Sequence, residues 1–437
     1  MLLRRSVALA RHRRAASTIA VGVSGGVDSA LAALLLRAQG HDVIGVHMTN
    51  WDAAEEAPEA ASCIEQEARD ARRVCDHVGI GFHEVNFVRE YWHNIFEPLL
   101  EGYSDGGTPN PDVACNRHIK FDRFVSHALA LGADCVATGH YARLDHACET
   151  TRLLTAMDAG KDQTYFLAAV RQQGLQKTRF PIGHLHKADV RALAACAGLH
   201  TAAKRDSTGI CFIGKRRFGD FLGGYLPQMP GEFRCVESGR AVGRHKGYAL
   251  YTPGQRARVS GARARWYCVD KDVASNVVWV CEGHGHSSLY TRSLVTHPTH
   301  WVSGAPPAAL RTAGGTMRCE VRIRHPGELH ACTVEVHSPE GHTTTCNDDP
   351  EAGSALLVRF DEPVRSVAPL QALAMYDGHV CLGGANIARR GRSLWEEMKG
   401  VDATAALGGG AAPLVAASRG DVSMGHGSHQ SSLKSIG

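Results

Sequence analysis

The stretch that decides the fold is TIAVGVSGGVDS, residues 18–29. Its first six residues are apolar and predict a buried strand, and apolar side chains recurring over residues 28–38 predict a helix. Between them, Gly25 and Gly26 let the backbone turn tightly, so that its N–H groups and the positive helix end can face an anion. The pattern predicts a phosphate-binding loop, but without the lysine of the ordinary P-loop, so simple γ-phosphate transfer is not expected. The alternative is a glycine turn that only caps the helix.

Strand and helix patterns alternate through the region that follows. Apolar runs at 42–49, around Val85 and around Val136 predict further strands, and residues 63–78 predict a helix. This alternation is typical of an α/β, Rossmann-like fold with a parallel sheet covered on both faces. Ligands of such sheets lie beyond the carboxyl ends of the strands. Those ends fall at Ser24, Met48 and Gly139.

The character of the chain changes after residue 215. Glycine and proline become frequent, and short alternating runs replace the helix-length patterns. Four runs are typical of strands in a small antiparallel β-barrel: 316–325, 355–360, 371–376 and 379–384. We therefore expect a catalytic domain over 18–214, a central linker domain over 215–290, a C-terminal β-barrel over 291–393 and a largely disordered tail over 394–437.

Composition and charge limit the class of protein. The chain has 437 residues, 44% of them hydrophobic, which is enough for two or three domains with cores. No apolar run is long enough to span a membrane, so we expect no membrane partner. The net charge of +4 includes five arginines within residues 1–17, and the remainder carries −1. A nucleic-acid partner would therefore have to meet local basic patches.

The basic N-terminus and the cysteines bear on the cellular compartment. Residues 1–17 contain no acidic residue, as in an organelle-targeting presequence, so we expect a mitochondrial protein. The alternative is an untargeted basic N-terminus on a cytoplasmic protein. Fourteen cysteines without a repeated spacing do not form a disulfide framework. Most are expected to be reduced core residues, which leaves one or two catalytic thiols.

The loop Ser24–Ser29 resembles the pyrophosphatase loop of the N-type ATP pyrophosphatases, which cleave ATP to AMP and pyrophosphate while adenylating an oxygen. Other segments resemble the signature segments of tRNA-specific 2-thiouridylases, and the resemblance runs in order over roughly residues 18–390. It implies a tRNA-uridine 2-sulfurtransferase of mitochondrial type, with an ATP pyrophosphatase domain first. The segments are 108–116, 137–142, 161–165, 209–214, 243–254 and 382–384.

Two of those segments contain a cysteine, Cys115 and Cys211. Pro109 and Pro111 stiffen the first segment and are expected to hold Asp112 and Cys115 out of regular structure. A carboxylate three residues before a thiol is well placed to move protons near it. Because a free cysteine is only about a few per cent thiolate at neutral pH, a working thiol needs positive neighbours, and basic residues follow both cysteines. Judged singly, each cysteine is more often structural.

The resemblance also implies a mechanism and its residues. ATP, with Mg²⁺ expected beside it, adenylates the C2 oxygen of the wobble uridine. Cys211 carries a persulfide from a sulfur-donor protein, Cys115 helps to release that sulfur, a disulfide between them closes the cycle, and Asp112 is the general acid/base. The implied nucleotide-binding residues are Gly22, Val23, Ser24, Gly25, Gly26, Val27, Asp28, Ser29, Met48 and Gly139. The implied tRNA-binding residues are Asn110, Pro111, Asp112, His140, Lys161, Asp162, Gln163, Arg324, His325 and Gln371.

The sequence departs from the family pattern at two positions and leaves three alternatives. His325 stands where the family usually has an aromatic residue, and Thr208 where glutamine is common. Another adenylating enzyme, such as a lysidine synthetase, would need no cysteine pair. A tRNA-binding sulfur-relay protein would have lost ATP chemistry, which the intact loop argues against. An iron–sulfur cluster on Asp112, Cys115 and Cys211 is the third, although the sequence has no C-x₂-C pair.

Overall fold

The computed structural model describes residues 16–52, 58–147, 149–206, 216, 218–312, 314–337 and 353–400, with side chains in the helix Pro58–Val78 from Glu65 onward. Residues 1–15 of the expected presequence, the end of the expected tail from 401, and Cys211 with Thr208 lie outside this range. Among the described residues, no helix is both long enough and apolar enough to cross a bilayer.

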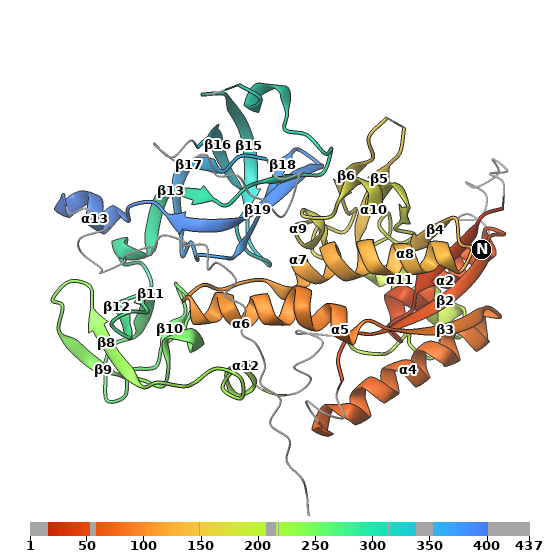
Figure 1. The fold of residues 1–437 in the computed structure, drawn as a ribbon, viewed down its shortest axis with the longest axis horizontal. Helices are drawn as coiled ribbons and strands as arrows, with labels where there is room; N and C mark the ends of the chain where they lie inside the picture. Colours follow the sequence, from red (N-terminus) through yellow and green to blue (C-terminus); the bar gives the residue numbers. More distant parts are fainter. Residues whose placement is uncertain are drawn as a thin grey trace, which may run out of the picture.

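The first domain is built on a parallel sheet with the strand order β3-β2-β1-β4-β7 (Figure 1). Side chains alternate along β1, so that Ile19 and Val21 pack with α2, α4 and α11, whereas Ala20 faces the helices on the other side. The expected α/β fold, with both faces of the sheet covered, is confirmed. The elements are β1 Thr18–Gly22, α2 Val27–Ala38, β2 Asp42–Thr49, α4 Pro58–Val78, β3 Gly81–Asn86, β4 Cys135–Ala137, β7 Thr178–Arg179 and α11 Lys187–Cys196.

The second face of the sheet is covered by a chain of short helices between β3 and β4. Their aromatic side chains form one core, in which Trp51 contacts Phe96 with a ring separation of 4.9 Å. These helices are α5 Val88–Tyr91, η1 Trp92–Phe96, α6 Glu97–Ser104, α7 Pro111–Cys115, η2 Asn116–Arg123 and α8 Phe124–Ala130. After β4 follow β5 Ala142–Asp145, β6 Arg152–Thr155, α9 Thr164–Leu167 and α10 Gln172–Gln176.

A small central domain follows the helix α12 Phe218–Leu222. Its strand order is β10-β11-β12-β8-β9, and Phe233, Cys268 and Val278 form part of its core. Figure 1 shows this domain below the barrel and away from the parallel sheet. The elements are β8 Gly231–Cys235, β9 Ala241–His245, η3 Tyr248–Leu250, β10 Arg256–Ala257, β11 Trp266–Asp272, β12 Val277–Glu282 and η4 Ser287–Leu289.

The last domain is a closed antiparallel barrel. Six strands run in the order β13-β17-β16-β15-β18-β19, and β19 pairs again with β13, which closes the sheet as expected from the sequence. A bridge to the first domain was not expected: β6 pairs with β19, with Leu153 opposite Cys381. The elements are β13 Tyr290–Thr296, β14 His300–Trp301, η5 Ala308–Leu310, β15 Thr316–Arg322, β16 His330–Val336, β17 Leu356–Arg365, β18 Ala372–Asp377 and β19 Val380–Arg390.

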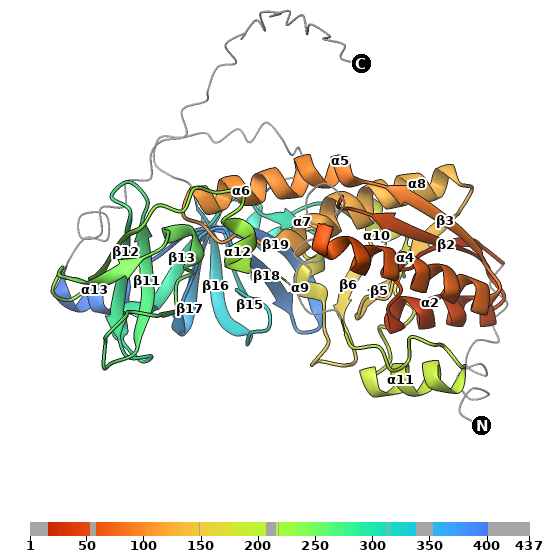
Figure 2. The same ribbon diagram turned by 90° about the horizontal axis from the view of Figure 1, so that it is seen from below.

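The chain does not lose structure at residue 394, where the disordered tail was expected to begin. The helix α13 Leu394–Lys399 docks on the barrel edge (Figure 2). Ser393 and Glu396 form a reciprocal capping box, and the Arg390 guanidinium makes two hydrogen bonds of 2.7 and 2.9 Å to the Glu396 carboxylate. Arg390 also contacts Asp270 of the central domain at 3.3 Å. This ion pair therefore joins the barrel, its terminal helix and the central domain.

The Arg390→Met variant should lower the melting temperature of the protein. Although burial opposes ionisation of Glu396, the hydrogen bonds from Arg390 lower its carboxyl pKa, and the variant leaves that carboxylate buried without its partner. Removing one partner of a buried pair costs about 3–5 kcal/mol. Because the pKa of Glu396 is depressed in the folded state, the difference between variant and wild type should shrink as acid protonates it. Differential scanning calorimetry measures this, with the exposed neighbour Arg389→Met as control. Equal melting temperatures would contradict the assignment.

Candidate functional site

The loop between β1 and α2 is held closed by its own hydroxyl groups. The Ser29 hydroxyl donates to the Gly26 carbonyl at 3.2 Å, and the Ser24 N–H donates to Ser29 Oγ at 3.2 Å. Gly25 has a φ of +71°, and a Cβ there would lie 2.6 Å from the Glu67 carbonyl oxygen. A Cβ on Gly26 would meet only Ser24 Oγ, at 3.4 Å. Gly25 is thus required by the turn itself, whereas the space in front of Gly26 is open for a ligand.

The other expected nucleotide residues meet this loop at the carboxyl edge of the sheet. A Cβ on Gly22 would lie 3.2 Å from the Met48 methyl carbon, at the end of β2. A Cβ on Gly139, after β4, would lie 2.6 Å from the Ser29 nitrogen, so this turn packs directly on the first residues of α2. The structure therefore brings together strand ends that are far apart in the sequence.

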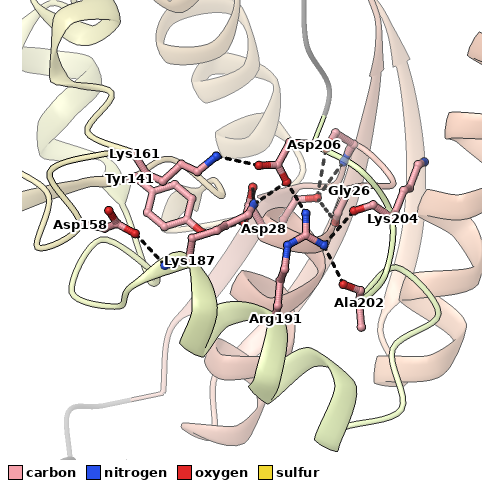
Figure 3. Close-up of polar contacts among 12 residues, drawn as sticks. Gly26, Asp28, Tyr141, Asp158, Lys161, Lys187, Arg191, Ala202, Lys204 and Asp206 are labelled. Carbon is pink, nitrogen blue, oxygen red and sulfur yellow. Dashed lines mark hydrogen bonds and ion pairs between the residues drawn. The ribbon is translucent and has the colours of Figure 1, made fainter. Parts of the chain in front are cut away.

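A network of charged side chains surrounds the loop, and the sequence did not reveal it (Figure 3). Lys187, at the start of α11, contacts both Asp28 carboxylate oxygens at 2.8 Å and Asp206 at 3.0 Å. Lys161 contacts Asp206 at 2.8 Å, and Arg191 contacts the same carboxylate at 2.5 Å. Although burial opposes ionisation of Asp206, hydrogen bonds from Lys161 and Lys187 lower its carboxyl pKa to about 2. Asp206 therefore remains charged and holds three cations beside the loop.

Two further contacts tie this network to the loop backbone and to the turn after β4. Lys204 donates to the Gly25 carbonyl at 3.0 Å and to Asp70 at 2.7 Å. The Tyr141 hydroxyl donates to Asp28 at 2.8 Å. Lys187 and Arg191 are four residues apart on α11, a spacing that places them on one helix face. That spacing was the only local signal for this network.

Asn110 to Cys115 are not irregular, as the prolines led us to expect. Residues 111–115 form the short helix α7, with Pro111 at its first position, where proline is favoured. Asn110 caps it, because its side-chain oxygen accepts from the N–H groups of Asp112 at 3.1 Å and Val113 at 3.4 Å. Cys115 ends the helix and is buried in the core of the second face.

The carboxyl group of Asp112, in the first turn of α7, has a raised pKa. Its side chain reaches solvent, but the surrounding atoms displace enough water to raise its pKa, while Lys120 and His325 oppose that rise. His140 lies nearby, beside the rings of Phe121 and Phe180. Burial and the charge of Lys120 hold the pKa of His140 well below its usual range. Lys120 thus acts on both groups. The His140 ring lies 5.5 Å from that of Phe121 on η2, the helix that continues α7, so the turn that packs on the phosphate loop also contacts this helix.

The segment after β6 brings expected tRNA residues next to the nucleotide loop, but Asp162 does not face solvent. It is 3% exposed, and its carboxylate accepts from Thr164 at 2.7 Å and from Arg322 of the barrel at 3.2 Å. Internal partners thus surround the Asp162 side chain, and its place in the expected tRNA segment stays a prediction. Gln163 accepts from the Tyr141 N–H at 2.8 Å, and the Lys161 side chain is partly exposed.

The remaining expected tRNA residues lie on the barrel side of α7. Arg324 is exposed and has no ion-pair partner in the part of the chain that the structure describes, whereas the His325 ring packs against Phe166 at 4.6 Å. Gln371 accepts weakly from Asn110 Nδ2 at 3.4 Å. Between α6, α7 and strands β18 and β19 lies a cavity of about 360 Å³. Its polar lining includes Asn110, Arg117, His118, Tyr165, His300 and Asn386.

The central domain carries exposed cations that the sequence analysis missed. Seven exposed cations lie within residues 240–265, and none has a carboxylate partner among the described residues. We call this group the central-domain cations. Their signal was present as the run QRARVSGARARW, residues 255–266. The seven are Arg240, Arg244, Lys246, Arg256, Arg258, Arg263 and Arg265.

Comparison with known families matches all three domains. Residues 17–215 match a family described as the tRNA methyl transferase HUP domain, residues 219–282 its PRC-barrel domain, and residues 291–387 an aminomethyltransferase β-barrel domain. A synthetase of NMN from Francisella tularensis is similar in structure at a TM-score of 0.30 and 15% identity, covering 50% of this chain and 78% of that one. A similarity this low carries no argument.

Sequence relatives are much closer. The tRNA-specific 2-thiouridylase MnmA of Alkaliphilus oremlandii is 45% identical over 84% of this chain and 96% of its own length. The protein of the same name from Bacillus velezensis is 44% identical over 86% of this chain and 97% of its own length. At this identity and coverage, the chain belongs to the tRNA-specific 2-thiouridylase family.

Proposed function

We propose that this protein is an ATP-dependent tRNA-uridine 2-sulfurtransferase. It adenylates the C2 oxygen of the wobble uridine and replaces that oxygen with persulfide sulfur, giving 2-thiouridine, AMP and pyrophosphate. The observation that carries the proposal is the turn after β4, which packs on the phosphate loop through Gly139 and contacts η2, the continuation of α7, through the His140 and Phe121 rings. Gly139 packs on Ser29, His140 follows it, and the charge of Lys120 acts on both His140 and Asp112. A nucleotide at the loop would thus lie beside a base held at α7.

The loop and its charged network would bind ATP. Residues 22–29 with Met48 and Gly139 would contact the nucleotide, and the open face of Gly26 would receive the phosphates. Lys187, Arg191 and Lys204 would balance the charge of the departing pyrophosphate. Mg²⁺ usually binds through one or two carboxylates and the substrate phosphates, so Asp28 would hold it and the ion would neutralise phosphate charge there.

The cysteines and Asp112 would carry out the sulfur transfer. Burial raises the pKa of Asp112, and a carboxyl with a raised pKa is a better proton donor partner than an unperturbed one. The sulfane sulfur on Cys211, supplied by a donor protein, would attack C2 and displace AMP. Cys115 would then attack Cys211, which releases the sulfur to the base and leaves a disulfide. Reduction of that disulfide by a thiol would restore the enzyme.

The tRNA would lie across all three domains. Asn110, Pro111 and Asp112 would contact the flipped-out uridine, since a base must leave its stack before its ring reacts. His140, Lys161, Gln163, Arg324, His325 and Gln371 would contact the nucleotides around it, and the cavity behind α7 would receive a neighbouring base. The central-domain cations would bind backbone phosphates farther along the stem.

Two proposals concern organisation. We place the domain boundaries at 18–214, 215–290 and 291–393, although the pairing of β6 with β19 makes the first and last domains share a sheet. We also propose that residues 1–17 direct the protein to mitochondria, because five arginines and no acid form the composition of such a presequence.

The first prediction separates the two loop glycines. Gly26→Val should abolish AMP formation but keep the melting temperature, because its side chain enters open space where phosphates would bind. Gly25→Val should also lower the melting temperature, because its Cβ clashes with the Glu67 carbonyl. AMP release and calorimetry measure the two effects. A Gly26→Val protein that loses tRNA affinity as strongly as AMP formation would show that the loop is misassigned.

The second prediction separates adenylation from sulfur transfer. Cys115→Ser and Cys211→Ser should both release pyrophosphate when tRNA is bound, because adenylation needs no thiol. Neither should make 2-thiouridine, since a serine hydroxyl cannot hold or exchange a sulfane sulfur. Mass spectrometry of tRNA nucleosides, after incubation with ATP and a persulfide donor, measures the product.

Peptide mass spectrometry then assigns the roles of the two thiols. Persulfide should accumulate on Cys211 in the Cys115→Ser variant. The exposed Cys196 at the end of α11 provides a control, because Cys196→Ser should retain full activity. A Cys211→Ser enzyme that still makes 2-thiouridine would disprove the mechanism.

The third prediction concerns Arg324. If this exposed arginine contacts a tRNA phosphate, Arg324→Ala should weaken binding and reduce the slope of log K against log salt by about one unit. Pyrophosphate release from ATP at saturating tRNA should not change. Arg318 is the matched control, because it lies on β15 of the same barrel and pairs with Asp361 at 2.6 Å. An unchanged slope in Arg324→Ala would remove Arg324 from the interface.

A further inference from the structure

The segment Lys161–Tyr165 contacts the nucleotide loop and the barrel with alternate residues, and we call it the strap. Lys161 and Gln163 point to the side of the nucleotide loop, whereas Asp162 and Thr164 contact the barrel. The strap is therefore connected to both regions at once.

The barrel end of the strap is buried and is held by an ion pair and hydrogen bonds. Arg322 pairs with Asp162 at 3.2 Å, and their side chains are only 15% and 4% exposed. Thr164 donates to Asp162 at 2.7 Å and lies 3.2 Å from the Tyr376 hydroxyl. His325, three residues after Arg322, contacts the Asp162 carbonyl oxygen at 3.2 Å. The neighbouring Arg324 is exposed, so this end of the strap begins at the proposed tRNA surface.

The other end of the strap reaches the phosphate loop through two routes. Lys161 binds Asp206, which also holds Lys187 and Arg191 (Figure 3). Gln163 accepts from the Tyr141 N–H at 2.8 Å, and the Tyr141 hydroxyl donates to Asp28 at 2.8 Å. Both routes end on side chains that touch the loop or its helix.

Contacts on either side of the strap hold the first domain and the barrel at a fixed separation. The pairing of β6 with β19 joins the two domains beside the strap, and the Tyr165 hydroxyl donates to the Ala372 carbonyl at 2.8 Å. A displacement at His325 therefore cannot be absorbed by sliding of the domains. It has to be transmitted along the strap or resisted by it.

We propose that Arg322 and Asp162 are positioning residues, which couple tRNA contact at the barrel loop to the geometry of Lys161 and Tyr141 at the nucleotide loop. The inference rests on the proposed function of the two surfaces. Neither side chain needs to touch tRNA or ATP, since Asp162 is buried and Arg322 nearly so. The ion pair instead sets where the strap lies, and both ligands act on the strap.

Thermodynamic linkage makes this coupling measurable from both sides. If tRNA tightens the binding of a nucleotide by some factor, the nucleotide must tighten the binding of tRNA by the same factor. The probe is α,β-methylene ATP, which binds but cannot be cleaved between its α and β phosphates. We expect saturating tRNA to tighten its binding to the wild-type protein by roughly 5–150-fold, the usual range of allosteric coupling.

The decisive variant is Arg322→Gln. It removes the positive charge that pairs with Asp162 of the strap but leaves the exposed residues Arg324 and His325 in place. Its coupling factor should fall to within about twofold of one in both directions, below the range typical of allosteric coupling. Affinity for tRNA without nucleotide should change much less. Arg318→Gln is the matched control. Arg318 lies on β15 like Arg322, but its pair with Asp361 is exposed and does not touch the strap.

Arg322→Gln leaves Asp162 buried without its charged partner, which can destabilise the barrel, so a second variant distinguishes loss of coupling from loss of stability. Arg322→Lys keeps the charge, so it should restore part of the coupling, which a loss of packing alone would not do. Both variants are compared at a temperature where calorimetry shows them folded.

The outcomes are distinct. Coupling that persists unchanged in Arg322→Gln, or equal loss in Arg318→Gln, would overturn the inference. A wild-type protein that makes 2-thiouridine but shows no coupling would also overturn it and leave the proposed function intact. A wild-type protein that makes no 2-thiouridine and binds neither ligand would remove the proposed function itself.

Discussion

The Asp28 carboxylate is the contact on which the geometry of the site depends. It lies in the first turn of α2, and it accepts from Lys187 of α11 and from Tyr141 of the turn after β4. Asp28 and its two partners come from three separate parts of the chain, so this partly buried carboxylate fixes α2, the turn after β4 and Lys187 relative to the glycine loop. Charge-assisted hydrogen bonds of this kind are about twice as strong as neutral ones. The loop can therefore keep an open face without collapsing.

The shared sheet explains how a site can span two domains. Interfaces between domains usually permit relative motion unless they are large and apolar. Here β5 and β6 extend the barrel sheet through β19, and buried side chains such as Leu153, Tyr376 and Cys381 pack together at the junction. Gln371 of the barrel can consequently hold Asn110 of the first domain within hydrogen-bond distance. The position of α7 is thus set by both domains.

The sequence could predict the features that depend on local pattern. A glycine loop between a strand and a helix, with Met48 and Gly139 at neighbouring strand ends, follows from the rule that parallel strands end at one edge. It could not predict the network of Asp206, because Lys161, Lys187 and Arg191 meet there only after folding. The interior position of Asp162 was hidden for the same reason, since its partner Arg322 lies 160 residues away.

The errors at α7 and at residue 394 have a different origin. Prolines were taken to exclude regular structure, but the first turn of a helix needs no N–H from proline, so Pro111 begins α7 instead of preventing it. The composition of the tail gave no sign of the helix α13, because the partner that stabilises it is Arg390 on a strand and not a neighbour within the helix. Short helices held by tertiary contacts leave little periodic signal.

Lys120 links the proton chemistry of the two halves of the site. Crowding raises the pKa of Asp112 and lowers that of His140, so both groups favour their neutral forms, and the charge of Lys120 shifts both pKa values downward. Lys120 therefore works against crowding at Asp112 and with it at His140. At neutral pH the imidazole of His140 is therefore uncharged. The single cation on η2 thus favours the charged carboxylate of Asp112 and the neutral imidazole of His140, because lowering a pKa has opposite effects on the charge of an acid and of a base.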